Sequence, residues 1–181
     1  MPTTPNPFTR KPPAAPTVAQ LIRFGAREFD AAGLAYGHGT ADARDDAAAL
    51  VFHALGLDHA DPGSAYAVKP GRPQIEQVLG LFAERLRRRV PVAYLMGRMW
   101  FAGLEFEVDQ RVIVPRSPFA ELIARGFAPW IDSARVLRIV DLGTGSGCIA
   151  VACALRFPQA RVDAVDLPAA ALEVAARNVA R

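Results

Sequence analysis

Cysteine and long apolar runs are scarce in this sequence, and each absence excludes a class of protein. Two cysteines occur, Cys148 and Cys153, five positions apart within an apolar segment. This spacing indicates neither a disulfide framework nor a metal site, so we expect two small core residues on different faces of a helix. No apolar run approaches the ~20 residues that a membrane span requires.

The N-terminus also lacks the features of a secretory signal. Its first sixteen residues, MPTTPNPFTRKPPAAP, have no apolar centre and are rich in proline. We therefore expect a disordered, Pro-rich tail over residues 1–17, in a cytoplasmic protein that does not contact a membrane.

A strong excess of one charge is absent as well, because 21 Lys and Arg face 18 Asp and Glu. The net charge of +3 fits many ordinary enzymes and does not require direct binding to nucleic acid. The densest group of cations is Arg85, Arg87, Arg88 and Arg89. It has two interpretations: a solvated helix end that suits the helix dipole, which we favour, or a contact with RNA or an acidic partner.

Apolar residues, in contrast, are abundant, at 51% of the chain, and the first half places them at helical spacing. A helix is predicted over 18–32, and a second begins at the expected N-cap Thr40 and ends at Gly56. After a loop at 59–73, a third helix carries one apolar stripe, Ile75, Val78, Leu79, Phe82 and Leu86. These patterns predict a helical module over residues 18–90.

The spacing of apolar residues changes after Pro91, from a helical to an alternating pattern. Residues 99–101 and 104–108 read as two strands joined at Ala102-Gly103, which predicts a β-hairpin linker over 91–115. From residue 116 onward, a helix follows Pro118, and strands at 136–141 and 161–166 alternate with helices after the glycines and at 168–180. This order predicts an α/β domain with a parallel βαβ unit over 116–181.

The segment VDLGTGSGCIA, residues 140–150, joins the first of these strands to its helix. A phosphate-binding P-loop needs Lys and Ser or Thr after its last glycine, but Cys148 and Ile149 stand there. The dinucleotide-binding fingerprint needs its third glycine at position 148, and this position is a cysteine, so that motif is not matched either. Close backbone approach without a diphosphate pattern favours a nucleoside ligand, of which S-adenosylmethionine is the commonest candidate.

Two acidic residues flank this glycine loop. Asp166 ends the following strand, where a carboxylate can accept hydrogen bonds from ribose hydroxyls. Asp141, before the loop, can meet a cationic amino group of the ligand. The alternative is that the glycines only allow a helix and a strand to pack closely, and we consider it the weaker interpretation.

At this point the sequence resembles a known family. DLGTGSGCIAVACA and FPQARVDAVD are similar to the cofactor loop of the glutamine N5-methyltransferases of the HemK/PrmB group. The segments YGHGT and RRVPVAYLMGRMWFAGLEFEVDQRVIVPRSP resemble the branch that methylates the large-subunit ribosomal protein numbered three. In that branch Pro-Arg-Ser-Pro stands where the release-factor branch has Pro-Arg-Pro-Glu-Thr, and this chain has Pro115-Arg116-Ser117-Pro118.

The resemblance implies a Rossmann-like, class I methyltransferase domain preceded by a helical substrate-recognition module. It implies that S-adenosylmethionine is the cofactor, and that a large-subunit ribosomal protein, in the context of ribosome assembly, is the partner. The residues that it assigns to cofactor binding are Asp141, Gly143, Thr144, Gly145, Ser146, Gly147 and Asp166. Arg116 is either a wall of the pocket or part of a structural turn, with equal weight.

The family's Asn-Pro-Pro-Tyr motif, which binds the glutamine amide, does not occur in the sequence. We therefore assign no catalytic residue, and we expect that the chain represents the N-terminal part of such an enzyme, with only the first two βα units of the domain, and is inactive alone. Two alternatives stay open: a release-factor methyltransferase of the sister branch, and a non-catalytic module that binds S-adenosylmethionine or NAD.

Overall fold

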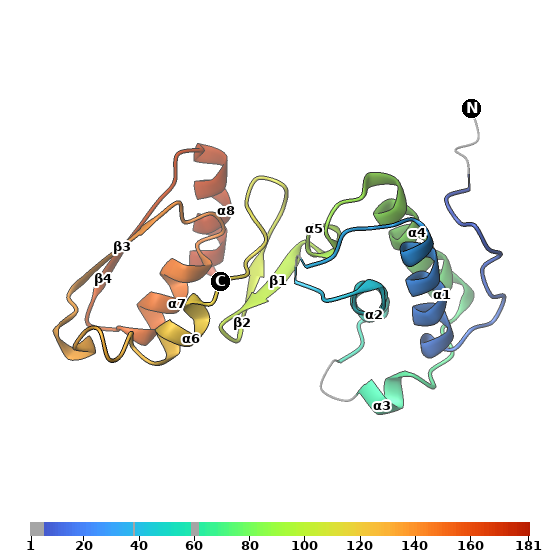
Figure 1. The fold of residues 1–181 in the computed structure, drawn as a ribbon, viewed down its shortest axis with the longest axis horizontal. Helices are drawn as coiled ribbons and strands as arrows, with labels where there is room; N and C mark the ends of the chain where they lie inside the picture. The colour runs from blue at the N-terminus through green and yellow to red at the C-terminus, as the bar shows by residue number, and fades with distance from the viewer. Residues whose placement is uncertain (1–5, 38, 59–61) are drawn as a thin grey trace. The chain divides into compact units, whose positions relative to one another are not determined.

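A computed structural model describes residues 6–37, 39–58 and 62–181. The chain divides into two compact units, Met1–Met96 and Gly97–Arg181, which we call the helical unit and the α/β unit (Figure 1). Each has its own hydrophobic core. Of the helices in the described ranges, none combines the length and the apolar character needed to cross a membrane.

The described helices of the first unit are α1 (Val18–Ala31), α2 (Ala43–Leu55), α3 (Pro62–Ala65), α4 (Arg72–Arg88) and α5 (Val92–Met96). Helix α1 begins with a capping box, in which the Thr17 and Gln20 side chains each accept a hydrogen bond from the other's backbone N–H. The predicted apolar stripes of α1 and α4 lie in one core with α2, as expected from their 3.6-residue period.

Helix α2 begins slightly later in the sequence than we predicted. Its N-cap is Asp42, whose side chain accepts from the N–H groups of Arg44 and Asp45. Thr40 instead donates its hydroxyl proton to the Asp46 carboxylate. The predicted end of α2 is confirmed, because Gly56 takes the left-handed conformation of a C-cap.

Two of the arginines at the end of α4 have contacts that the sequence did not predict. Arg85 is buried: its guanidinium contacts the Asp46 carboxylate at 2.8 Å and donates to the carbonyl of Ala35 at 2.9 Å. Arg89 is the left-handed C-cap and donates to the carbonyls of Ala32 and Gly33. These two cations therefore tie α4 to α2 and to the end of α1, which is a structural role.

Residues 6–17, for which the composition predicts disorder, run along α1 with defined contacts. Phe8 packs on Phe24, and both the N–H and the hydroxyl of Thr9 donate to the buried Glu28 carboxylate. Arg10 forms an ion pair with the same carboxylate at 3.1 Å. Burial alone would raise the pKa of Glu28, but the Thr9 hydrogen bond and Arg10 lower it below its ordinary value. A buried carboxylate that needs partners thus orders this segment.

The α/β unit opens with the predicted hairpin. Strands β1 (Arg98–Phe101) and β2 (Leu104–Glu107) are antiparallel, with Trp100 opposite Glu105. Residues 112–115 form no strand, and they lead into α6 (Phe119–Ala124) and a short 3₁₀ helix at Ser133–Arg135.

The predicted βαβα segment follows. Strand β3 (Arg138–Leu142), helix α7 (Cys148–Arg156), strand β4 (Arg161–Val165) and helix α8 (Ala169–Ala180) occur in this order, and β3 pairs in parallel with β4 (Figure 1). The unit is thus α/β, as expected. Cys148 and Cys153 are both buried in its core with Phe101, Phe106 and Phe157, so both α7 faces that carry them are covered.

Candidate cofactor-binding site

The glycine loop, residues 143–147, connects the carboxyl end of β3 to the first turn of α7. Its three glycines have φ angles of 74°, 55° and 80°, a region that L-residues with a side chain rarely adopt. A Cβ on Gly147 would lie 3.2 Å from Cβ of Ala175 in α8, whereas a Cβ on Gly143 would meet nothing within 4 Å. Gly147 therefore serves packing, while Gly143 leaves backbone open to a ligand.

Backbone hydrogen bonds fix the loop against the end of β4. The N–H groups of Gly143 and Thr144 both donate to the carbonyl of Val165, at 2.8 and 3.0 Å. The Thr144 hydroxyl donates to the Asp141 carboxylate at 2.6 Å. These hydrogen bonds hold the loop in one conformation without a ligand. A site in which a ligand lies close to the backbone requires such a fixed loop.

Asp166 lies at the centre of this arrangement. Its Oδ2 accepts the N–H of Gly145 at 2.7 Å, and its Oδ1 accepts the N–H of Leu167 at 2.8 Å. The sequence suggested this carboxylate only as a ribose ligand; the structure adds a contact with the glycine loop across 21 positions of the chain. A carboxylate has about four acceptor positions, so two hydrogen bonds leave capacity for hydroxyl donors.

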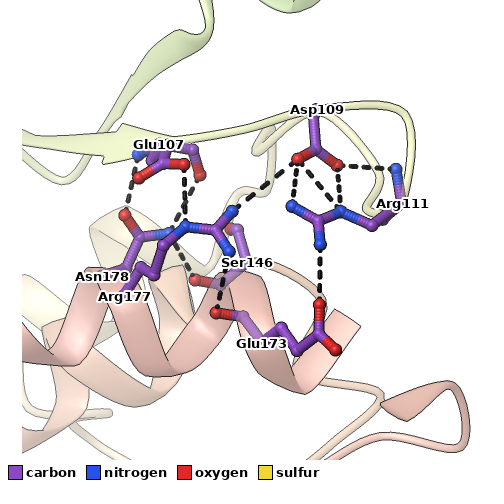
Figure 2. Close-up of polar contacts among 7 residues, drawn as sticks. All are labelled: Glu107, Asp109, Arg111, Ser146, Glu173, Arg177 and Asn178. Carbon is purple, nitrogen blue, oxygen red and sulfur yellow. Dashed lines mark hydrogen bonds and ion pairs between the residues drawn. The ribbon is translucent and has the colours of Figure 1, made fainter. Parts of the chain in front are cut away.

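Sequence reasoning missed Asn178, which lies in α8 and is buried. Its Nδ2 donates to the carbonyl of Ser146 at 2.8 Å and to that of Glu107 at 2.9 Å, and its Oδ1 accepts the N–H of Glu107 at 2.7 Å (Figure 2). The available signal was an asparagine at helical spacing from the apolar residues Ala171, Val174 and Ala175. Such a position predicts burial but does not identify the partners.

Ion pairs surround this contact between β2 and α8 (Figure 2). Arg177 contacts Glu107 at 2.8 Å, and Arg111 contacts both Asp109 and, at 2.8 Å, Glu173. The hydrogen bonds from Arg111 lower the pKa of Asp109 to about 2, although partial burial acts in the opposite direction. The network holds the turn after β2 on α8, and a Cβ on Gly145 would lie 4.0 Å from the Cβ of Val112 in the segment after that turn.

The thiols of Cys148 and Cys153, near the loop, are both buried. Burial is the main cause that raises the pKa of Cys148 and of Cys153 above the ordinary value, and a thiol that stays protonated is a poor nucleophile. Within the described ranges, no three His, Cys, Asp or Glu side chains gather closely enough to hold a metal ion.

The structure brings the predicted site residues together. Asp141, Thr144, Gly145 and Asp166 are linked by hydrogen bonds, and Ser146 is tied to α8. Arg116 is exposed, and its role stays a prediction. Gly143 is exposed, and the loop that contains it is hydrogen-bonded to the carboxylates of Asp141 and Asp166, which suits a ligand that has a cationic group and vicinal hydroxyls.

Comparison with known proteins first defines the class. The family model described as methyltransferase small domain matches residues 125–181, which include β3, the glycine loop, α7, β4 and α8.

The particular relatives are glutamine methyltransferases. The chain is 50% identical over 166 residues to the ribosomal protein uL3 glutamine methyltransferase of Xanthomonas campestris, which covers 91% of this chain and 54% of the relative. The proteins of that name from Bordetella pertussis and Xylella fastidiosa are 50% and 49% identical, over 91% of this chain and 55% and 53% of their own. The chain thus spans about half the length of the curated relatives it matches, and the family resemblance predicted from the sequence is confirmed.

Proposed function

We propose that the protein transfers a methyl group from S-adenosylmethionine to the side-chain amide nitrogen of a glutamine in ribosomal protein uL3. The observation that carries this proposal is the bonded cluster of Asp141, Thr144, Gly145 and Asp166 within the matched methyltransferase domain. The names of the relatives supply the substrate.

The loop chemistry supports S-adenosylmethionine as the cofactor. We assign the ribose hydroxyls to Asp166 and the cationic amino group to Asp141, because each carboxylate keeps acceptor capacity beyond its bonds in the structure. Gly143, Thr144, Gly145, Ser146 and Gly147 would face the methionine part. The parallel β3–β4 pair with α7 and α8 supports a Rossmann-like, class I arrangement.

Methylation of an amide is difficult because the nitrogen lone pair is delocalised into the carbonyl group. When bound, S-adenosylmethionine would supply an electrophilic methyl group on its sulfonium sulfur, and methylation of the amide nitrogen would release one proton to solvent. The residues of this chain act before that step, by fixing the position of the donor. We assign no catalytic residue among residues 1–181, and we assign recognition of the protein substrate to the helical unit.

The Pro115-Arg116-Ser117-Pro118 segment favours a ribosomal-protein substrate over a release factor. Pro118 is the N-cap of α6, and the Ser117 hydroxyl accepts the N–H of Phe119 at 3.2 Å. The segment therefore has a structural role in the helix start as well. A release-factor enzyme and a binding module without activity are the alternatives that the following experiment separates.

The test is Asp166→Ala in the full-length protein, with binding of S-adenosylmethionine measured by calorimetry. Loss of hydrogen bonds to a charged acceptor should weaken binding by roughly 30- to 1000-fold, or about 2–4 kcal/mol. Asp166→Asn should lose less, because the amide keeps an acceptor oxygen for the Gly145 N–H. Asp163→Ala is the matched control, since Asp163 lies in β4, which ends one residue before Asp166, but pairs with Arg138 and Arg161.

Methyl transfer is measured separately with labelled cofactor and with unmethylated uL3 or release factor as acceptor. We expect label on a glutamine of uL3. An unchanged dissociation constant for Asp166→Ala would overturn the assigned cofactor site. Label on release factor alone would place the protein in the sister branch, and tight binding without transfer to either acceptor would leave only a binding module.

A further inference from the structure

Asn178 satisfies three backbone groups that are distant in the sequence. Its side chain bonds to Ser146 in the glycine loop, 32 positions away, and to both the N–H and the carbonyl of Glu107 in β2, 71 positions away (Figure 2). The residue is 6% exposed, so water offers little replacement for any of these bonds. A buried backbone group that loses its partner is costly.

The amide group suits this position better than other side chains of its size. It provides two N–H donors and one carbonyl acceptor, and the two receiving carbonyls and the donating N–H match that set. Toward Glu107 it forms the pair of bonds that a neighbouring strand would form. Toward Ser146 it holds the carbonyl of a residue that lies between Gly145 and Gly147, both of which have left-handed backbone conformations.

We propose that Asn178 is a positioning residue of the cofactor site, which locks the glycine loop and the end of the hairpin into one arrangement. This inference rests on the proposed function, because it assumes that the loop binds S-adenosylmethionine. Asn178 does not touch the ligand in this role. It acts through Ser146, and it sets the approach of the segment after β2, which brings Val112 to Gly145.

Its neighbour Arg177 provides a matched control. Arg177 attaches α8 to the same residue of β2, but through the partly exposed Glu107 side chain, and it has no hydrogen bond to the glycine loop among the described residues. If the site needs only a firm contact between β2 and α8, substitution of either residue should weaken cofactor binding. If the site needs the loop peptide held in place, only substitution of Asn178 should weaken it.

The experiment compares Asn178→Asp, Asn178→Ala and Arg177→Ala in the full-length protein, under conditions where circular dichroism finds each folded. Asn178→Asp keeps the shape but sets a carboxylate against the carbonyls of Ser146 and Glu107. At pH 8 we expect it to bind S-adenosylmethionine roughly 5- to 100-fold more weakly than the wild type, with Asn178→Ala similar. Arg177→Ala should stay within about twofold, as an exposed pair does.

A pH profile separates hydrogen bonding from space filling. When the carboxyl group introduced by Asn178→Asp is protonated, it regains one donor, so the deficit of this variant relative to the wild type should shrink toward pH 5. The deficit of Asn178→Ala should not change. Expressing each value relative to the wild type cancels the titration of nearby charged groups, which are Glu107 and Asp109 after β2, Glu173 and Arg177 on α8, and Asp141 and Asp166 at the loop.

Amide hydrogen exchange supplies a readout without ligand. In Asn178→Asp at pH 8, exchange at Gly145 and Gly147 should accelerate about tenfold or more while the core of α7 keeps its protection. Binding equal to the wild type together with unchanged loop exchange would overturn the proposal, as would equal losses in Arg177→Ala. If the wild type itself fails to bind S-adenosylmethionine, the proposed function falls, and the exchange result still decides whether Asn178 positions the loop.

Discussion

The two units of this protein differ in the burial of the ion pairs that hold their elements together. In the helical unit, the ion pair between Arg85 and Asp46 is almost fully buried, with side chains 3% and 1% exposed. In the α/β unit, the ion pairs among the hairpin, the turn after it and the C-terminal residues 173–181 are 27–65% exposed. A buried pair must have every partner in place, whereas exposed pairs exchange easily with water and contribute little each.

The apolar side chains, like the ion pairs, are more exposed in the α/β unit than in the helical unit. Among the described residues, fourteen large apolar side chains are exposed, and thirteen of them belong to the α/β unit. Three of these, Val140, Leu142 and Val165, alternate with residues that face α7, so they lie together on the other face of β3 and β4. The helical unit thus encloses its own core, while the α/β unit presents apolar surface of the kind that meets other polypeptide.

The largest expected effect of a mutation tests the buried pair. Arg85→Ala would leave the buried Asp46 carboxylate with only the Thr40 hydroxyl and would remove the donor to the Ala35 carbonyl, which should lower the free energy of unfolding of the helical unit by about 3–5 kcal/mol. Urea denaturation followed by circular dichroism measures the change. Both tryptophans, Trp100 and Trp130, lie in the α/β unit, so their fluorescence follows that unit separately.

Arg88→Ala is the control for this prediction. Arg88 is exposed on the same helix and contacts Glu84 only at 3.7 Å, so its loss should cost less than about 0.5 kcal/mol. Equal destabilisation by the two variants would contradict the distinction between buried and exposed charge. The double variant Arg85→Met with Asp46→Leu should recover much of the loss, because it removes both charges together.

A smaller effect is expected from two glycines within helices of the same unit. A Cβ on Gly25 of α1 would lie 2.5 Å from the ring of Phe82, which is fully buried and packs edge-to-face on Phe29. Gly25→Ala should therefore destabilise by about 1–3 kcal/mol. A Cβ on Gly80 of α4 would meet nothing within 4 Å, so Gly80→Ala should stabilise by about 0.5–1 kcal/mol. Thermal unfolding measures both variants. If the core is packed as described, the midpoint temperature should fall in Gly25→Ala and rise in Gly80→Ala; a change in the same direction in both would contradict this packing.

Local patterns predicted the elements around the glycine loop well, because glycines, strand and distal carboxylate all act within about 30 residues, the span of one βαβ unit. The parallel pair of β3 and β4 and the helices α7 and α8 follow from such patterns. The residues predicted to bind the cofactor between Asp141 and Gly147 are neighbours in the chain, and only Asp166 had to be brought to them.

The contacts that sequence reasoning missed are those between distant polar residues. Arg85 looked like one of four cations at a helix end, since nothing local shows that Asp46, 39 positions earlier, lies beside it. Asn178 fits an apolar helix face, and its partners lie 32 and 71 positions away. The N-cap of α2 was misplaced for a different reason: Thr40 and Asp42 are both good capping residues, and the contact of Thr40 with Asp46 decides between them.

The smallest expected effect concerns the exposed network of the α/β unit. Hydrogen bonds from Arg111 lower the pKa of Asp109 from an ordinary 3.8 to about 2, so the folded state favours the charged carboxylate. The resulting stability is complete above pH 4 and is lost as the pH falls from about 4 to 2. Because the Asp109 side chain is 39% exposed, its contribution should stay below about 1 kcal/mol.

Asp109→Asn measures this contribution through the thermal midpoint reported by tryptophan fluorescence. The wild type should exceed the variant by a few degrees at most at pH 5, and most of the difference should be lost by pH 2. It should also shrink in 1 M salt, where charges are screened within about 3 Å, while the effect of Arg85→Ala on the helical unit should persist. A difference that grows on acidification, or that resists salt as the buried pair does, would show that the two units do not differ in their use of charge.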